Sequence, residues 1–131
     1  MLNDMLAGTI RSFDGGKKAG EEKPEKFWQE LKLGFLSDRL KMHRVKSSRE
    51  GGYGRYDVVL DPIRLNGTAV IMEFKLFDAK EESLEDTCRR ALEQIENRNY
   101  ESDLLVRGIP KENIVIYGLG FGEKECLAMR G

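Results

Sequence analysis

Apolar residues recur at helical spacing in two segments, residues 24–40 and 83–98. In the first segment the apolar positions on one face are Phe27, Trp28, Leu31, Phe35 and Leu36. In the second they are Leu84, Cys88, Ala91, Leu92 and Ile95. Pro24 suits the first turn of a helix, and Ser83 is a suitable N-cap. The pattern therefore predicts two amphipathic helices over these segments.

Residues 53–60 and 68–77 are rich in β-branched and aromatic side chains, which predicts two strands. Between them lies Asn66-Gly67, a dipeptide typical of the tight connection in an antiparallel hairpin. Three further segments have extended character: polar residues 42–49, the dense apolar run 114–119, expected to be buried on both faces, and the weaker 123–129. The resulting order, α-β-β-β-α-β-β, predicts an α/β fold with a mixed sheet flanked by helices.

The N-terminal residues 1–23 are weakly patterned and differ from the rest of the chain. Residues 1–13 could form a short helix, and residues 14–23 are rich in Gly, Lys and Glu, as flexible linkers are. With 131 residues the chain is long enough for one compact domain. We therefore expect an arm and linker over 1–23 and one domain over 24–131.

Charge argues against a general nucleic-acid-coating protein, because the formal net charge is only −1. The distribution is uneven, however. Residues 78–86 are acidic on balance, whereas residues 39–49 hold no acid and contain Arg39, Lys41, His43, Arg44, Lys46 and Arg49. This basic stripe fits a phosphate backbone as well as it fits an ordinary solvated surface.

The expected cellular location of the protein rests on two features that the sequence lacks, a membrane-spanning apolar run and a secretory signal. No apolar run reaches the roughly 20 residues needed to cross a bilayer, so we expect no membrane association. Cys88 and Cys126 belong to no metal-ligand motif, and we expect two reduced thiols. Without a secretory signal at residues 1–10, the expected location is the cytoplasm.

Candidate chemistry lies in the strand 68–77, where Glu73 and Lys75 share one face because side chains alternate along a strand. Folded back as a hairpin, the preceding strand can place Asp57 beside Glu73. Two adjacent carboxylates repel each other, and a cation with oxygen ligands, such as Mg²⁺, would relieve that repulsion. Lys75 could then position the attacking water or stabilise transition-state charge. Taken alone, the pair Glu73 and Lys75 is more typical of an exposed, salt-bridged face.

Four segments, taken in their order along the chain, favour the metal site over an exposed salt-bridged face: residues 49–57, 71–75, 91–95 and 117–121. Together with residues 27–36 they resemble the PD-(D/E)xK nuclease superfamily, in particular the nuclease-like domain at the C-terminus of bacterial AAA-ATPase-like proteins. The resemblance covers about residues 24–131. It implies a restriction-endonuclease-like αβββαβ core and metal-dependent hydrolysis of phosphodiester bonds.

Carried onto this sequence, the resemblance implies that Asp57 and Glu73 hold Mg²⁺ or Mn²⁺ and that Lys75 is the catalytic lysine. Gln94 would support the site or contact substrate, and Glu50, preferred to Glu25, would add an acidic group. Two positions depart from the family pattern: Tyr56 stands where proline is usual, and Gln29 where close relatives usually carry histidine. No P-loop occurs in the chain, so an ATPase partner would be a separate domain or chain.

Contacts to nucleic acid, with DNA as the expected type, would come from Arg44, Lys46, Arg49, Arg55 and Tyr100. Arg55 could bind phosphate or pair with Glu73. Tyr100 could stack on a base, although packing at a helix end is more usual. Gly118 and Gly120 indicate close packing or a bulge. The sequence thus favours an endo- or exonuclease, and a homodimer is conceivable. The alternative is an inactive nuclease-fold module that binds DNA or a protein partner and serves an ATPase.

Overall fold

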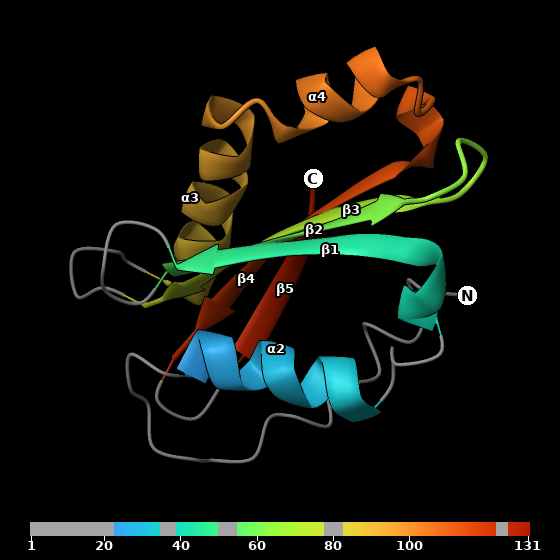
Figure 1. Cartoon of the computed structure of the whole chain (residues 1–131). Coiled ribbons are helices and arrows are strands. Elements are labelled where there is room, and N and C mark those ends of the chain that lie inside the picture. The colour runs from blue at the N-terminus through green and yellow to red at the C-terminus, as the bar shows by residue number, and fades with distance from the viewer. Residues whose placement is uncertain (1–22, 35–38, 50–54, 78–82, 123–125) are drawn as a thin grey trace.

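The computed structural model describes residues 23–34, 39–49, 55–77, 83–122 and 126–131 (Figure 1). The predicted arm over 1–23, the glycines at 51, 52 and 54, and Glu50 therefore lie almost wholly outside the described residues. The helical elements are α2 (Lys23–Gly34), η1 (Arg39–Met42), α3 (Leu84–Asn97), α4 (Tyr100–Arg107) and η2 (Lys111–Asn113), of which η1 and η2 are 3₁₀ helices. The strands are β1 (His43–Arg49), β2 (Arg55–Pro62), β3 (Ala69–Leu76), β4 (Ile114–Phe121) and β5 (Cys126–Arg130).

The strands form one mixed sheet in the order β1-β2-β3-β4-β5. β3 and β4 are parallel, and every other neighbouring pair is antiparallel. A parallel pair needs a long crossover, which α3, α4 and η2 supply between β3 and β4. The α/β fold, the mixed sheet flanked by helices and the β2–β3 hairpin are thereby confirmed.

Helices cover the two faces of the sheet unequally, with α2 on one side and α3 and α4 on the other (Figure 1). The core on the α2 side contains Phe27, Trp28, Tyr56, Val58, Leu60, Val70, Met72, Phe74, Leu119 and Phe121. The core on the α3–α4 side is smaller and contains Val59, Ala69, Ile71, Ile95, Leu104, Ile109 and Ile114. Because neighbouring residues of β2 and β3 alternate between these cores, every second position faces each helix layer.

Close packing of α3 on β4 depends on Gly118. A Cβ atom there would lie 2.5 Å from the carbonyl oxygen of Cys88 and 2.9 Å from Cγ of Leu92. The close approach expected for the β4 glycines is therefore present. Cys88 forms no disulfide with Cys126, and its thiol donates to the Leu127 carbonyl oxygen at 3.3 Å.

Several predicted boundaries were wrong. The helix predicted over 24–40 is described as α2 over Lys23–Gly34, residues 35–38 lie outside the described residues, and Arg39 and Leu40 belong to the separate 3₁₀ helix η1 instead. β4 is longer than predicted, and Ile116 and Tyr117 are only half-buried rather than covered on both faces. The Ser83 cap is correct, since its hydroxyl accepts a hydrogen bond from the Asp86 amide at 3.2 Å.

The sequence pattern did not predict the helix α4. Its eight residues are too few to show a clear apolar period, and Leu104 is the buried residue among them. Its end does carry a stop signal, because Gly108 adopts φ +107° and Pro110 follows. Asn99 at φ +60° reverses the chain between α3 and α4, a conformation that asparagine tolerates.

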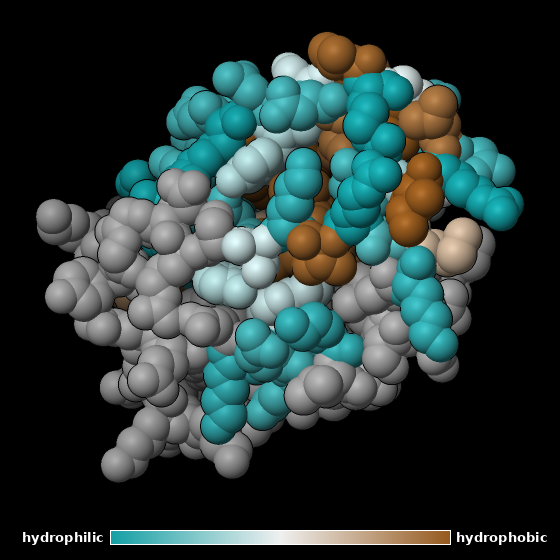
Figure 2. All heavy atoms as spheres, viewed as in Figure 1, coloured by the Kyte–Doolittle hydropathy of each residue, from teal (hydrophilic) through white to brown (hydrophobic). Residues whose placement is uncertain are grey.

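Figure 2 shows largely hydrophilic side chains on the visible face, with hydrophobic ones gathered toward the end where α4 lies. Leu105 and Val106 of α4 are among the exposed hydrophobic residues. No helix in the described ranges is long and apolar enough to cross a membrane.

Candidate active site

Asp57 and Glu73 are direct partners across the β2–β3 hairpin. Both carboxylates are on the α3–α4 side of the sheet and both are buried, at 2% and 0% relative exposure. Directly opposed residues in antiparallel strands have Cβ atoms about 4.5–5.5 Å apart, so the two acidic side chains start from neighbouring positions. The hairpin thus brings together two groups that are 16 residues apart in the sequence.

Lys75 follows Glu73 by two positions in β3 and therefore lies on the same face. It is half-buried, and its partner across the hairpin is Arg55. The carboxylate pair and the lysine consequently form one continuous group on the side of the sheet that α3 and α4 cover.

Arg55 pairs with Glu73, with Nε at 3.9 Å from Oε2. This is the ion-pair alternative that the sequence left open. Nε and Nη2 of Arg55 are buried and make no hydrogen bond within the described part of the chain. Unsatisfied buried donors are costly, and an oxygen acceptor such as a phosphate oxygen would satisfy them.

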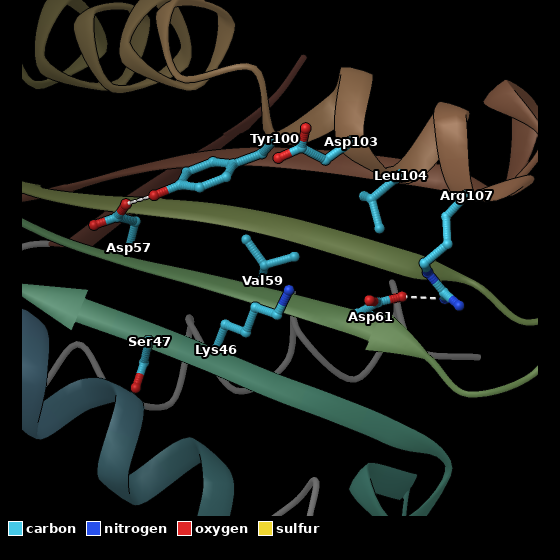
Figure 3. A pocket seen from close by; sticks show the side chains of 9 residues that line it. All are labelled: Lys46, Ser47, Asp57, Val59, Asp61, Tyr100, Asp103, Leu104 and Arg107. Atoms are coloured by element: carbon cyan, nitrogen blue, oxygen red, sulfur yellow. Dashed lines mark hydrogen bonds and ion pairs between the residues drawn. The ribbon is translucent and has the colours of Figure 1, made fainter.

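Asp57 is held from the opposite side by α3 and α4. Arg98 Nη1 lies 3.5 Å from Oδ2 of Asp57, and the Tyr100 hydroxyl donates a hydrogen bond to the same oxygen (Figure 3). The Arg98 Nη2 atom in turn donates to Oε1 of Gln94 at 3.4 Å. Gln94 is thus linked to Asp57 through Arg98, a residue that the sequence reading did not single out.

The surroundings of Tyr100 shift the pKa of its phenol. Burial, together with the hydrogen bond to the Asp57 carboxylate, raises the pKa of the Tyr100 phenol from 10.0 to about 12. The phenol therefore remains a hydrogen-bond donor well above neutral pH. Helix-end packing, the more usual of the two expected roles, agrees with this contact.

The basic stripe divides between the two faces of the sheet. The pairing of β1 with β2 places Arg44 opposite Asp61 and Lys46 opposite Val59, on the α3–α4 side. Both side chains are exposed. Arg49 is opposite Tyr56, which belongs to the other core, and the Arg49 side chain lies outside the described residues. His43 is half-buried, and its Nε2 atom is 2.7 Å from the Thr68 carbonyl oxygen.

The donor set of this site fits a divalent cation. Mg²⁺ prefers carboxylate oxygens and retains several waters, so one or two protein carboxylates suffice. Asp57 and Glu73 are the acidic residues that face each other directly across the hairpin. Across the described ranges no group of three or more His, Cys, Asp or Glu residues is placed to hold a metal ion.

A pocket adjoins this site between α4 and the β1–β2 edge of the sheet. Its volume is about 210 Å³, and it is lined by Lys46, Ser47, Asp57, Val59, Asp61, Tyr100, Asp103, Leu104 and Arg107 (Figure 3). Arg107 closes the far end through an ion pair with Asp61 and a 2.6 Å hydrogen bond to the Pro62 carbonyl oxygen. This pocket was not predictable from the sequence, because four of the residues that line it belong to the undetected helix α4.

Comparison with known proteins gives one match. A family model described as the PD-(D/E)XK nuclease superfamily matches residues 23–130. No curated protein and no solved structure matches the chain.

Proposed function

Because the chain belongs to the PD-(D/E)XK nuclease superfamily, we propose that it is a metal-dependent nuclease that hydrolyses phosphodiester bonds in nucleic acid, with DNA as the expected substrate. The direct pairing of two buried carboxylates, Asp57 and Glu73, supports this most strongly. Members of this superfamily generally use divalent metals, and the oxygen-rich hairpin suits such an ion.

In this proposal Asp57 and Glu73 hold Mg²⁺ or Mn²⁺. When bound, such an ion lowers the pKa of a coordinated water and polarises the phosphate. The Tyr100 hydroxyl and the Arg98 guanidinium contact one Asp57 oxygen and so restrict the rotation of that carboxylate. Gln94 acts through Arg98 and is a positioning residue.

Lys75 is the catalytic lysine of the proposal. Its place on the carboxylate face lets the ammonium orient the attacking water or stabilise the negative charge that develops on the phosphate oxygens. Arg55 would offer its buried nitrogens to the same phosphate. Glu50 and Arg49, which precede β2 in the sequence, stay in the proposal as an additional acid and a phosphate contact.

A gel assay tests this function with single-stranded, double-stranded and branched nucleic acids in the presence of Mg²⁺ or Mn²⁺. We expect cleavage by the wild type and a loss of at least about a hundredfold in Lys75→Ala and Asp57→Ala, since each removes a group that acts on the transition state. Lys26→Ala, which removes an exposed lysine on the opposite helix α2, should cleave normally. A wild type that cuts none of the substrates while binding metal would contradict the nuclease proposal.

A second candidate is a nuclease-fold module without turnover that binds DNA or a protein partner. The Arg98 contact favours it, because that guanidinium already balances the Asp57 charge without a metal. Calorimetry with Mg²⁺ separates the two. A nuclease should bind the ion and lose that binding in Asp57→Ala, whereas absence of any Mg²⁺ affinity in the wild type would favour the binding module.

Both candidate functions, the active nuclease and the binding module, imply the same kinds of partner. Nucleic acid is the direct partner, through Arg44, Lys46 and Arg55 near the carboxylates. An ATPase domain or chain, as in the AAA-ATPase-like proteins that the sequence resembles, would act with either version, and two copies could address two strands. The cytoplasm is the compartment we propose for this activity.

A further inference from the structure

The α4 pocket shares a wall with the proposed catalytic site. Asp57 lines the pocket at one end, and Asp61 lines the other end, four positions along the same strand. Four residues of a strand span about 13 Å, so the pocket begins at the carboxylate pair and runs along β2 beneath α4. A group that enters it would belong to the part of the substrate immediately next to the scissile phosphate.

The lining of the pocket is unsuited to phosphate. Three carboxylates face it, from Asp57, Asp61 and Asp103, against one exposed cation, Lys46. The second cation, Arg107, is already held by Asp61 and by the Pro62 carbonyl oxygen. Arg98 likewise holds Asp57, so Lys46 is the lining cation left for a second phosphate, whose oxygens would also face carboxylates. A neutral group with N–H donors would instead find those carboxylate oxygens as acceptors.

Shape and apolar surface point to a flat ring. Val59 and Leu104 supply apolar side chains, and the Tyr100 ring forms the end wall (Figure 3). The hydrogen bond to Asp57 fixes that ring in advance, so little ordering is needed on binding. At about 210 Å³ the pocket is smaller than the pockets that hold whole drug-sized ligands, and it suits one ring system.

We propose that the α4 pocket receives a single unpaired nucleobase of the nucleotide next to the scissile phosphate, so that the enzyme acts on single-stranded or locally unpaired nucleic acid. This inference rests on the proposed nuclease function. A base inside a duplex is covered on both faces and cannot enter without being extruded from the stack. The Lys46 side chain, which extends from β1 toward the pocket in Figure 3, would contact the flanking phosphate.

The acidic lining also selects among the bases. Asp103 is an exposed acceptor in the wall, suited to an exocyclic amino group such as that of adenine, cytosine or guanine. Thymine lacks an amino group and offers carbonyl oxygens, which the carboxylates disfavour. The pocket therefore favours amino-bearing bases over thymine.

Binding is tested by fluorescence anisotropy on the full Lys75→Ala chain in Mg²⁺, so that affinity is measured apart from cleavage. The probes are labelled oligo(dA), oligo(dC) and oligo(dT) of equal length and a blunt duplex. We expect oligo(dA) and oligo(dC) to bind about tenfold more tightly than oligo(dT) or the duplex. Adding Asp103→Ala should remove most of the preference over oligo(dT). Glu101→Ala, which removes the same charge from α4 outside the pocket lining, should preserve it.

A second variant, Val59→Phe, fills the pocket from within and should reduce single-strand affinity to that of the duplex. Thermal unfolding checks that it folds; if it does not, the Asp103→Ala comparison decides alone. Equal affinity of Lys75→Ala for all four probes, or equal effects of Asp103→Ala and Glu101→Ala, would overturn the pocket assignment. Wild-type cleavage with no base preference would support the nuclease proposal and contradict the role of the pocket. Base preference without any wild-type cleavage would support the pocket as a base-binding site and contradict the nuclease proposal.

Discussion

Single residues at this site owe their properties to burial. Tyr100 is an ordinary phenol by sequence, yet it lies beside the buried carboxylate of Asp57 and donates a hydrogen bond to it. Ionising the phenol there would place two negative charges next to each other in a partly desolvated position. The raised pKa of Tyr100 follows from this, and it ties the stability of the domain to alkaline pH.

The free energy of unfolding should therefore fall as pH rises from 10 toward 12. The folded-state pKa of Tyr100 is raised to about 12 from 10.0, so its contribution is complete below pH 10 and is lost as pH rises through 12. Denaturant titrations across this range check the effect. Tyr100→Phe should show a shallower decline, because it has no phenol to ionise; identical declines in the two proteins would refute the assignment.

At the scale of elements, the sheet and the helix α3 approach each other closely because β4 carries glycine at the contact. The carbonyl oxygen of Cys88 occupies the place that a Cβ atom of residue 118 would take. A backbone oxygen cannot move aside as the end of a flexible side chain can. Residue 118 is therefore confined to glycine by the packing of two elements.

Gly118→Ala should lower the free energy of unfolding by about 1–3 kcal/mol, through the overpacking of α3 on β4. Urea denaturation followed by circular dichroism measures the change. Gly131→Ala is the matched control, since an added Cβ there would lie 3.0 Å from the flexible end of Leu92 and in ordinary van der Waals contact with Ile116, at 3.5 Å. A Gly118→Ala protein as stable as this control would show that α3 can shift without cost.

The molecule as a whole divides stability and chemistry between the two faces of its sheet. The α2 side holds the aromatic core, in which Phe27 packs edge-on against Phe74 and Phe121 with ring centroids 5.6 Å and 5.4 Å apart. The α3–α4 side holds the buried carboxylates and the pocket. A change on the first side should therefore alter stability more than it alters the site.

Phe27→Ala is expected to lower the free energy of unfolding by about 3–5 kcal/mol, because it leaves a cavity in the aromatic core. The Mg²⁺ affinity of the protein that remains folded, measured by calorimetry at low temperature, should stay within about threefold of wild type. Gln29→Ala, an exposed position on the same helix, should change neither property. A loss of Mg²⁺ affinity as large as that of Asp57→Ala would contradict the division between the faces.

Local patterns were sufficient for much of this structure. Alternation along β3 separates Glu73 and Lys75 from their apolar neighbours, and the Asn66-Gly67 connection predicts that β2 folds back on β3. These two facts place Asp57 and Glu73 on neighbouring strands. Their direct pairing was decided by the register of the longer connection over residues 63–68, because a two-residue turn at Asn66-Gly67 would have placed Asp57 opposite Leu76. The helix boundaries were less predictable, since Arg39 and Leu40, which the apolar pattern includes in the first helix, belong to the 3₁₀ helix η1.

The partners of Asp57 could not be found in this way. Arg98 and Tyr100 are separated from it by 41 and 43 residues, and both reach it from the turn between α3 and α4. Asn99, with its positive φ, and Gly108 at the end of α4 are the signals that could have located that turn and helix.

The sequence by itself determined which residues are strands, which strand faces are apolar and which carry charge, because side-chain periodicity is a property of the local backbone. Only the tertiary structure decided which groups contact the charged face. Arg98 and Tyr100 contact Asp57, Arg107 contacts Asp61, and the pocket lies between these contacts. Those contacts depend on how α4 is laid across the sheet. The crossover that places α4 there is set by the packing of many distant residues rather than by any local pattern.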